Sequence, residues 1–395
     1  MSSNVYGVVV AVGCVLIAPR DDLPAERSGP QVSPDQKATQ QRNGRLCAVR
    51  EYRLPGKEGE KERRRDPGVL AEKRCFASIC YSTDGSEIGA VTPGRSAIVW
   101  DTRTGRVKDR LNAHGGWWYF LDITPSGGRI AASATSDGPV VWVFRRAGAK
   151  PVVIRPVPPG SKEHRWHDEV RHLAASPDGR VIASGGDGYY SRIMLWDAVT
   201  GRNLGSIGPE GEPVCALAYT LKGDRVVAGH YSTGTVRVWD PSARVEVRSL
   251  SQDPPGEGLN AFALSPDGRL LAAGFADGNI KIWETANWGQ LKVINSGRED
   301  VFGVSFSPDS RRLAAVLSAG FVAVWDVAKG IRTHEGRAGN EERYDSSLRF
   351  SPNGRRIAVS TPDSIVEGSS GIPGGYLTRR LSKAPNSALP RFRTL

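Results

Sequence analysis

The sequence predicts an all-β protein assembled from repeated four-stranded units. Six tryptophans close short apolar runs, and they are separated by 42, 54, 43, 44 and 42 residues. Such self-similarity at a nearly fixed period is typical of repeat architectures. No long apolar pattern with a period of about 3.6 residues occurs, so we expect almost no helix. The tryptophans are Trp100, Trp142, Trp196, Trp239, Trp283 and Trp325.

A turn signal recurs in step with the tryptophans. Its copies read "YSTDGSEIGAV", "ITPSGGRIAAS", "ASPDGRVIASG", "YTLKGDRVVAG", "LSPDGRLLAAG", "FSPDSRRLAAV" and "FSPNGRRIAVS", the last beginning at Phe350. Gly in these turns tolerates a positive φ, and an Asp side chain bonds the local backbone. The chain therefore holds seven such turns but only six of the spaced tryptophans.

Each repeat predicts four short strands, as the fourth repeat illustrates. It reads "VCALAY", a turn around Gly223, "RVVAG", a turn around Gly234, "TVRVWD", a loop and "VEVRSL". Runs of four to six Val-, Ile- and Ala-rich residues between Gly, Asp, Asn and Pro are typical of strands and turns.

These motifs resemble the WD-repeat β-propeller family from about Arg45 to about Ser360. The version with "SPDGR" and "WDxxTG", found in bacterial proteins, is the closer match. The resemblance implies a seven-bladed β-propeller of four-stranded antiparallel blades around a central channel. One blade cannot bury both of its faces, so neighbouring blades must stack.

The resemblance also implies a structural cluster in each blade. In the family, a strand-end Trp, a Ser or Thr, a turn Asp and a His form a hydrogen-bonded group that stabilises the blade. A buried indole N–H needs such an acceptor. The third blade matches with His167, Ser184, Asp187 and Trp196, and the second with His114, Ser133, Asp137 and Trp142.

The last blade is atypical. After "RRIAVSTPDS" the chain has no Trp-Asp pair, which indicates a replaced or lost strand. Family members commonly complete the last blade with a strand from the other end of the chain. The segment that suits this role is Arg45–Leu54, pairing near Ile357–Ser360 or Ile365–Val366. We therefore expect a propeller over 45–366, closed by an N-terminal strand.

The positive charge of the chain lies mainly in its two ends. The net charge is +11; residues 37–75 hold 12 Lys and Arg against 6 Asp and Glu, and residues 366–395 hold 5 against 1. The blades are then close to neutral, which makes nucleic acid an unlikely partner. Residues 367–395 are basic and rich in Gly, Pro and Ser, which predicts a disordered tail.

The first 44 residues predict two segments outside the propeller. Residues 1–18 contain "VYGVVVAVGCVLIA", an apolar leader that is short for a membrane span and has no preceding Lys or Arg. Residues 19–44 are polar and Pro-containing, which predicts a disordered linker. A cytoplasmic location is favoured over export, and membrane contact is expected only if the leader is retained.

Candidate chemistry is sparse. "HRWHDEVRH" places His164, His167 and His172 close together, but a structural slot for His167 is favoured over a metal site. No "GxSxG" or "GxxxxGK" motif occurs, and the five cysteines lack metal-ligand spacing. We expect no catalytic residue, no metal and no cofactor. The alternative is a propeller enzyme, of hydrolase or lactonase type, acting at the channel mouth.

Aromatic residues in the expected loops are the best candidates for binding. The resemblance implies that those on blades two to four lie on one face of the disc, together with one arginine. Trp, Tyr and Arg are enriched at binding hot spots. The alternative is that these side chains fill gaps between blades. The sequence thus predicts a non-catalytic scaffold, a monomer within a complex, that binds a protein or peptide. The candidate residues are Trp117, Trp166, Tyr189, Tyr190, Arg192 and Tyr231.

Overall fold

The described part of the protein consists of β-strands joined by turns. The computed structural model describes residues 48–52, 77–82, 84–91, 96–112, 117–123, 128–135, 138–144, 151–155, 170–186, 192–250, 258–298, 300–338, 347–360 and 365–369. Within these residues the one helical element is a 3-10 turn, η2 (Ser318–Gly320). The expectation of almost no helix is met there.

The strands form four-stranded antiparallel sheets, numbered here in chain order. Sheet 1 contains β2 (Ala77–Tyr81), β3 (Glu87–Val91), β4 (Ser96–Asp101) and β5 (Val107–Asn112). Sheet 2 contains β6 (Trp117–Ile123), β7 (Arg129–Thr135), β8 (Gly138–Phe144) and β9 (Val152–Ile154). Sheet 3 contains β10 (Val170–Ala175), β11 (Val181–Gly186), β12 (Ile193–Asp197) and β13 (Asn203–Ile207).

The next three sheets repeat this meander. Sheet 4 contains β14 (Ala216–Tyr219), β15 (Val226–His230), β16 (Thr235–Asp240) and β17 (Val245–Leu250). Sheet 5 contains β18 (Leu259–Leu264), β19 (Leu270–Phe275), β20 (Asn279–Glu284) and β21 (Gln290–Asn295). Sheet 6 contains β22 (Val301–Phe306), β23 (Arg312–Leu317), β24 (Phe321–Asp326) and β25 (Ile331–Arg337).

Sheet 7 combines strands from both ends of the chain. Its order is β26 (Leu348–Phe350), β27 (Arg356–Ser360), β28 (Ile365–Ser369) and β1 (Ala48–Tyr52). The strands β1 and β28 are antiparallel, with Glu51 opposite Val366 and Tyr52 opposite Ile365. The third strand, which carries a tryptophan in each of the other sheets, is here β28 without a tryptophan.

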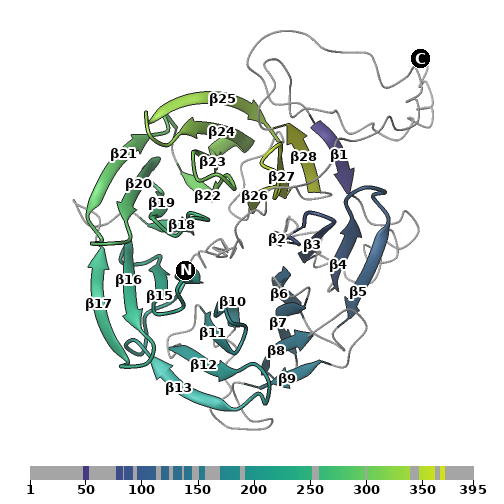
Figure 1. The fold of residues 1–395 in the computed structure, drawn as a ribbon, viewed down its shortest axis with the longest axis vertical. Helices are drawn as coiled ribbons and strands as arrows, with labels where there is room; N and C mark the ends of the chain where they lie inside the picture. Colours follow the sequence, from purple (N-terminus) through teal and green to yellow (C-terminus); the bar gives the residue numbers. More distant parts are fainter. Residues whose placement is uncertain are drawn as a thin grey trace, which may run out of the picture.

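The sheets lie around a central axis like the blades of a propeller, with their first strands innermost (Figure 1). The apolar core lies between neighbouring sheets. Between sheets 5 and 6, Ile282 and Trp325 belong to one buried cluster, and Trp325 is 2% exposed. Burying both faces of each sheet requires a neighbour on each side, which explains the stacked arrangement. The predicted all-β propeller with four-stranded antiparallel blades is confirmed.

Serine side chains link the innermost strands of neighbouring sheets. The Ser78 hydroxyl donates to the Leu121 carbonyl at 2.8 Å, which joins sheets 1 and 2. The Ile79 amide donates to Ser347 Oγ at 3.2 Å, which joins sheets 1 and 7. These buried backbone groups need partners, because an unpaired buried amide or carbonyl is costly.

The repeated Ser-Pro-Asp-Gly signal forms the turn between the first two strands of a sheet. In sheet 3, the Ser176 hydroxyl and the Arg180 amide donate to Asp178 Oδ1 at 2.6 and 3.0 Å. The Val181 amide donates to Ser176 Oγ at 2.9 Å, and Gly179 has a φ of 69°. The hydrogen bond from Ser176, followed by that from Arg180, lowers the pKa of Asp178. The carboxylate is therefore used to shape the turn.

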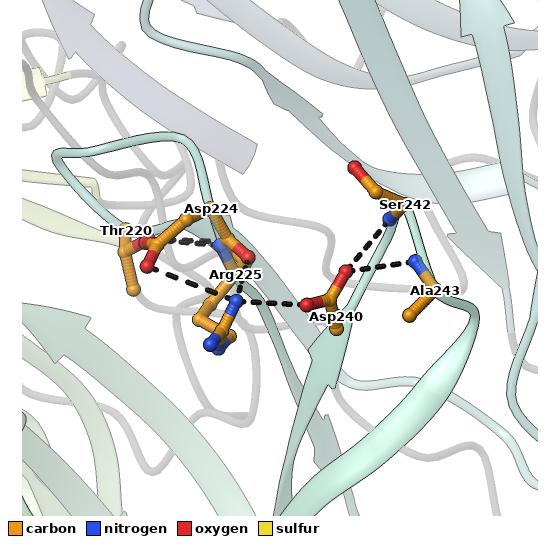
Figure 2. A network of polar contacts seen from close by, with 6 residues as sticks. All are labelled: Thr220, Asp224, Arg225, Asp240, Ser242 and Ala243. Atoms are coloured by element: carbon orange, nitrogen blue, oxygen red, sulfur yellow. Dashed lines mark hydrogen bonds and ion pairs between the residues drawn. The ribbon is translucent and has the colours of Figure 1, made fainter.

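The aspartate of the Trp-Asp pair shapes the turn at the end of the third strand. In sheet 4, the amides of Ser242 and Ala243 each donate to Asp240 Oδ1 at 2.9 Å. Arg225 Nη1, from the preceding turn, donates to Asp240 Oδ2 at 3.1 Å (Figure 2). Asp197 and Asp326 accept from backbone amides in the same way. The repeated Trp-Asp motif thus joins a core side chain to a turn cap.

Candidate functional site

The tryptophan of sheet 3 has the hydroxyl partner expected from the sequence. Trp196 Nε1 donates to Ser184 Oγ at 2.8 Å, and both side chains are buried. The antiparallel register of β11 and β12 brings them together, since Ile182 lies opposite Trp196. The other two members of this predicted cluster, His167 and Asp187, lie outside the described residues.

The predicted cluster of sheet 2 is described only in part. The backbone of Ser133 lies in β7, and the half-buried Trp142 lies in β8. His114 and Asp137 lie outside the described residues. Both clusters as complete four-residue groups therefore stay predictions.

Two of the predicted binding residues lie in the described loops of sheets 3 and 4. Arg192 pairs with Glu210 at 2.7 Å, and their side chains are 44% and 49% exposed. Tyr231 follows β15 and packs against the apolar cluster of sheets 4 and 5, with its ring close to Gly258. Arg192 therefore lies at the surface, whereas part of the Tyr231 ring fills the gap between two sheets.

The position predicted for Trp117 was wrong. We expected a loop residue, but Trp117 is the first residue of β6 and lies opposite Ala134 of β7. The reason is the sequence "WWYFLDI", whose aromatic and β-branched residues favour a strand and extend it toward the loop. Trp166, Tyr189 and Tyr190 lie outside the described residues.

A charged group that the sequence did not indicate lies beside these loops in sheet 4. Arg237 donates through Nη2 to Glu212 Oε1 and through Nη1 to Glu246 Oε2, both at 2.8 Å. The Nδ1 atom of His230 lies 3.2 Å from the Pro213 carbonyl, and burial lowers the pKa of His230 to about 4. The imidazole is therefore neutral near pH 7 and its Nδ1 donates.

The charged side chains beside these loops have an acidic balance. Arg192 and Arg237 face three carboxylates, those of Glu210, Glu212 and Glu246. Glu210 and Glu212 come from one loop and Glu246 comes from an outer strand, and only the folded sheet brings them together. A sequence signal would have been the pair of glutamates in "GPEGEPV", between two strands.

The innermost strands carry one carboxylate within the described residues, that of Asp122 in β6. Burial raises its pKa to about 7, and the positive charge of Arg349 in β26 partly opposes this rise. The corresponding positions of sheets 3, 4 and 5 hold Ala174, Ala218 and Ala263. Asp122 and Arg349 thus occupy a position at which sheets 3, 4 and 5 have a small side chain.

Histidine and cysteine side chains in this region are buried. His172 in β10 is 2% exposed, and burial lowers its pKa to about 3. Its predicted metal-site neighbours His164 and His167 lie outside the described residues. Among the described residues, no three His, Cys, Asp or Glu side chains form a group able to hold a metal ion. Burial raises the pKa of the Cys215 thiol to about 12, which makes it unreactive.

Comparison with known proteins identifies the repeats. Three segments, 161–197, 201–240 and 246–284, match the family described as WD domain, G-beta repeat. They cover most of sheets 3, 4 and 5, and each segment ends at the acidic residue of a Trp-Asp or Trp-Glu pair. The middle of the chain therefore carries WD repeats, and together with the fold this supports a WD-repeat β-propeller.

Several curated proteins are similar to this chain. A guanine nucleotide-binding protein subunit beta from Arabidopsis thaliana is 27% identical over 233 residues, covering 54% of this chain and 58% of the relative. A periodic tryptophan protein 2 homolog from Dictyostelium discoideum is 25% identical over 228 residues, covering 57% and 23%. An anaphase-promoting complex subunit cdh1 from the same organism is 31% identical over 118 residues, covering 29% and 15%.

The chain spans less than two thirds of the length of each of these relatives. They come from eukaryotes, so the expectation of a bacterial protein receives no support. Within the described residues, no helix has the length and apolar character needed to cross a membrane.

Proposed function

We propose that this chain is a non-catalytic scaffold that holds a protein or peptide partner on a rigid propeller. The observation that carries the proposal is the match of three WD repeats within a propeller of four-stranded sheets. Two similar proteins are named as subunits of larger assemblies. The recurrent Trp, Ser and Asp side chains are used in turns and cores, which is a structural role rather than a chemical one.

The proposed architecture is a seven-bladed ring, closed in its last blade by an N-terminal strand. The pairing of β1 with β28 supports this closure, because β1 supplies the outer strand that β26–β28 lack. The proposed boundaries are a leader over 1–18, a linker over 19–44, the propeller over 45–366 and a basic tail over 367–395. In a closed ring the first and last blades cover each other's faces, so each blade has a neighbour on both sides.

The proposed binding surface is the loop face of sheets 2 to 4. It contains Trp117, Trp166, Tyr189, Tyr190, Arg192 and Tyr231. The exposed Arg192–Glu210 pair and the Glu212–Arg237–Glu246 network support a polar rim on this face. Protein interfaces commonly combine aromatic anchors with such a rim. Asp122, the one carboxylate on the described parts of the innermost strands, is matched by the positive charge of Arg349, which favours a structural channel over a catalytic one.

The test is capture of partners from an extract of the native cell by the full-length protein. Replacing Trp117 and Tyr190 together with Ala should weaken capture by roughly 2–4 kcal/mol if both side chains are anchors. The melting temperature should fall little, because exposed anchors add little to folding. Val199→Ala, at a 52% exposed position in the opposite turns, serves as the control. Unchanged capture with a large loss of melting temperature would show that the two aromatic side chains are core residues.

A further inference from the structure

The turns of sheets 6 and 7 carry an excess of positive charge. They lie on the face of the propeller opposite the proposed loop face. The segments 307–312, 326–330 and 351–356 hold five cations and two carboxylates, a net charge of +3. The corresponding turns of sheets 3, 4 and 5 have net charges of −1, +1 and −1. The five cations, here called the turn patch, are Arg311, Arg312, Lys329, Arg355 and Arg356.

One residue keeps the turn of sheet 7 intact while removing a negative charge. Asn353 stands where sheets 3, 5 and 6 have aspartate. Its Oδ1 accepts from Ser351 Oγ at 2.8 Å and from the Arg355 amide at 3.0 Å, the same bonds that Asp178 accepts in sheet 3. The turn thus keeps its geometry, and its arginines lose the neighbouring carboxylate.

The two turns are joined, so their charges form one surface. Arg312 Nη2 donates to the Gly354 carbonyl at 2.8 Å, and its guanidinium lies 5.4 Å from the centre of the Phe350 ring. These contacts fix the turn of sheet 6 against the turn of sheet 7. Arg311, Arg355 and Lys329 are exposed, and the structure gives Arg355 and Lys329 no salt bridge within the described residues.

An apolar side chain lies beside these cations. Ile331 begins β25 directly after the turn that holds Lys329, lies opposite Asp326, and is 60% exposed. Acidic residues of a peptide can pair with the arginines while one apolar residue covers Ile331. Nucleic acid fits less well, because the aromatic ring at this surface, Phe350, is buried under Arg312 and offers no face for base stacking.

We propose that the turn patch is a second docking surface, which binds an acidic peptide segment of a partner protein carrying one apolar residue. It rests on the scaffold function proposed above and adds a partner chemistry and a separate face to it. The surface lies away from Arg192 and Tyr231, so the two faces can hold different partners, or two parts of the same one.

The test uses the full-length protein and a short labelled peptide of Glu and Asp with one central Leu. Binding is followed by fluorescence anisotropy at low and at moderate salt. Asn353→Asp restores the missing carboxylate without changing the turn, and should raise the Kd by about 2- to 5-fold. Arg311→Gln with Arg355→Gln should raise it by about 5- to 20-fold. Ile331→Ser should weaken binding of this peptide but not of one with Gln in place of Leu.

The controls separate a defined surface from diffuse attraction. Arg180→Gln with Arg269→Gln makes the same charge change at the equivalent positions of sheets 3 and 5, and should leave the Kd unchanged. Equal loss in both double variants would overturn the proposal, as would patch-dependent binding of a single-stranded oligonucleotide that exceeds binding of the peptide. Because the probe is synthetic, these results do not depend on capture by the Trp117 and Tyr190 face.

Discussion

Sheet 4 and sheet 7 build the same four-stranded unit from different parts of the chain. In sheet 4 the strands β14 to β17 follow one another within residues 216–250, and Asp240 joins its turns through Arg225 (Figure 2). In sheet 7 the outer strand β1 comes from the N-terminal side and pairs with β28, so Glu51 lies opposite Val366. A local unit is specified by its own turns, whereas sheet 7 forms only when distant segments meet.

This difference assigns different roles to the two sheets. The turns of sheet 4 join strands that are close in the sequence, and their hydrogen bonds lie within that sheet. The pairing of β1 with β28 joins segments separated by most of the chain. Closing such a long loop has an entropic cost, although this cost rises only slowly with loop length. We therefore expect sheet 7 to control the stability of the whole ring, and changes in sheet 4 to have smaller, local effects.

The largest expected effect comes from removing the closing strand. Deleting residues 1–56 should lower the free energy of unfolding by several kcal/mol and promote association, because it exposes the edge of β28. Deleting residues 1–40 keeps β1 and should leave a stable monomer. Thermal melting and light scattering compare the two proteins. If both melt alike and remain monomeric, the pairing of β1 does not stabilise the ring.

A smaller effect is expected from the charge that faces sheet 7 from sheet 2. Burial raises the pKa of Asp122 to about 7 in the folded protein, well above the usual range of an aspartate. Its contribution to stability is therefore present at low pH and is lost as the pH rises toward 7. Asp122→Asn should remove this dependence. Its advantage over the parent should grow by ~1–2 kcal/mol between about pH 5.5 and about pH 8.

Urea denaturation at both pH values measures this difference. Asp178→Asn is the matched control, because hydrogen bonds lower the pKa of Asp178. That carboxylate contributes stability above its unfolded pKa, so the control should show no gain at the higher pH. Parallel stabilities of the Asp122→Asn variant and the parent at both pH values would contradict an ionised, desolvated Asp122.

The same contrast explains what the sequence could predict. The spacing of the tryptophans and the repeated turns indicated the propeller, because each unit is encoded locally by a strand pattern and its caps. The N-terminal origin of a closing strand was expected from the resemblance, and Arg45–Leu54 contains β1. The carboxyl side of the last unit was harder, since β28 carries no Trp-Asp pair to mark it.

The candidate site was less predictable, because it depends on side chains from separate sheets. The hydrogen bond of Trp196 to Ser184 follows from one sheet and could be expected. The Glu212–Arg237–Glu246 network joins a loop to two strands and carries no motif. Tyr231 shows the limit of composition as a guide, because an aromatic loop residue is partly used for packing between sheets.

The smallest expected effect lies within sheet 4, where Asp240 has two functions that substitution can separate. Its Oδ1 caps the turn through the amides of Ser242 and Ala243, and its Oδ2 accepts from Arg225.

Asp240→Asn keeps an oxygen for the cap but loses the charge. It should lower the free energy of unfolding by about 0.2–1 kcal/mol, as loss of an exposed ion pair does. Asp240→Ala loses both, and should cost about 0.5–1.5 kcal/mol more, since the amides lose their acceptor. Urea denaturation of the full-length variants orders the two costs. A different turn, between β26 and β27 of sheet 7, shows that an amide oxygen can replace a carboxylate oxygen as a cap, because Asn353 Oδ1 accepts from Ser351 Oγ and from the Arg355 amide. If Asp240→Asn were as damaging as Asp240→Ala, the charge pair with Arg225 would be the main stabilising contact. The turns of sheets 4 and 7 would then differ in how they are stabilised as well as in charge.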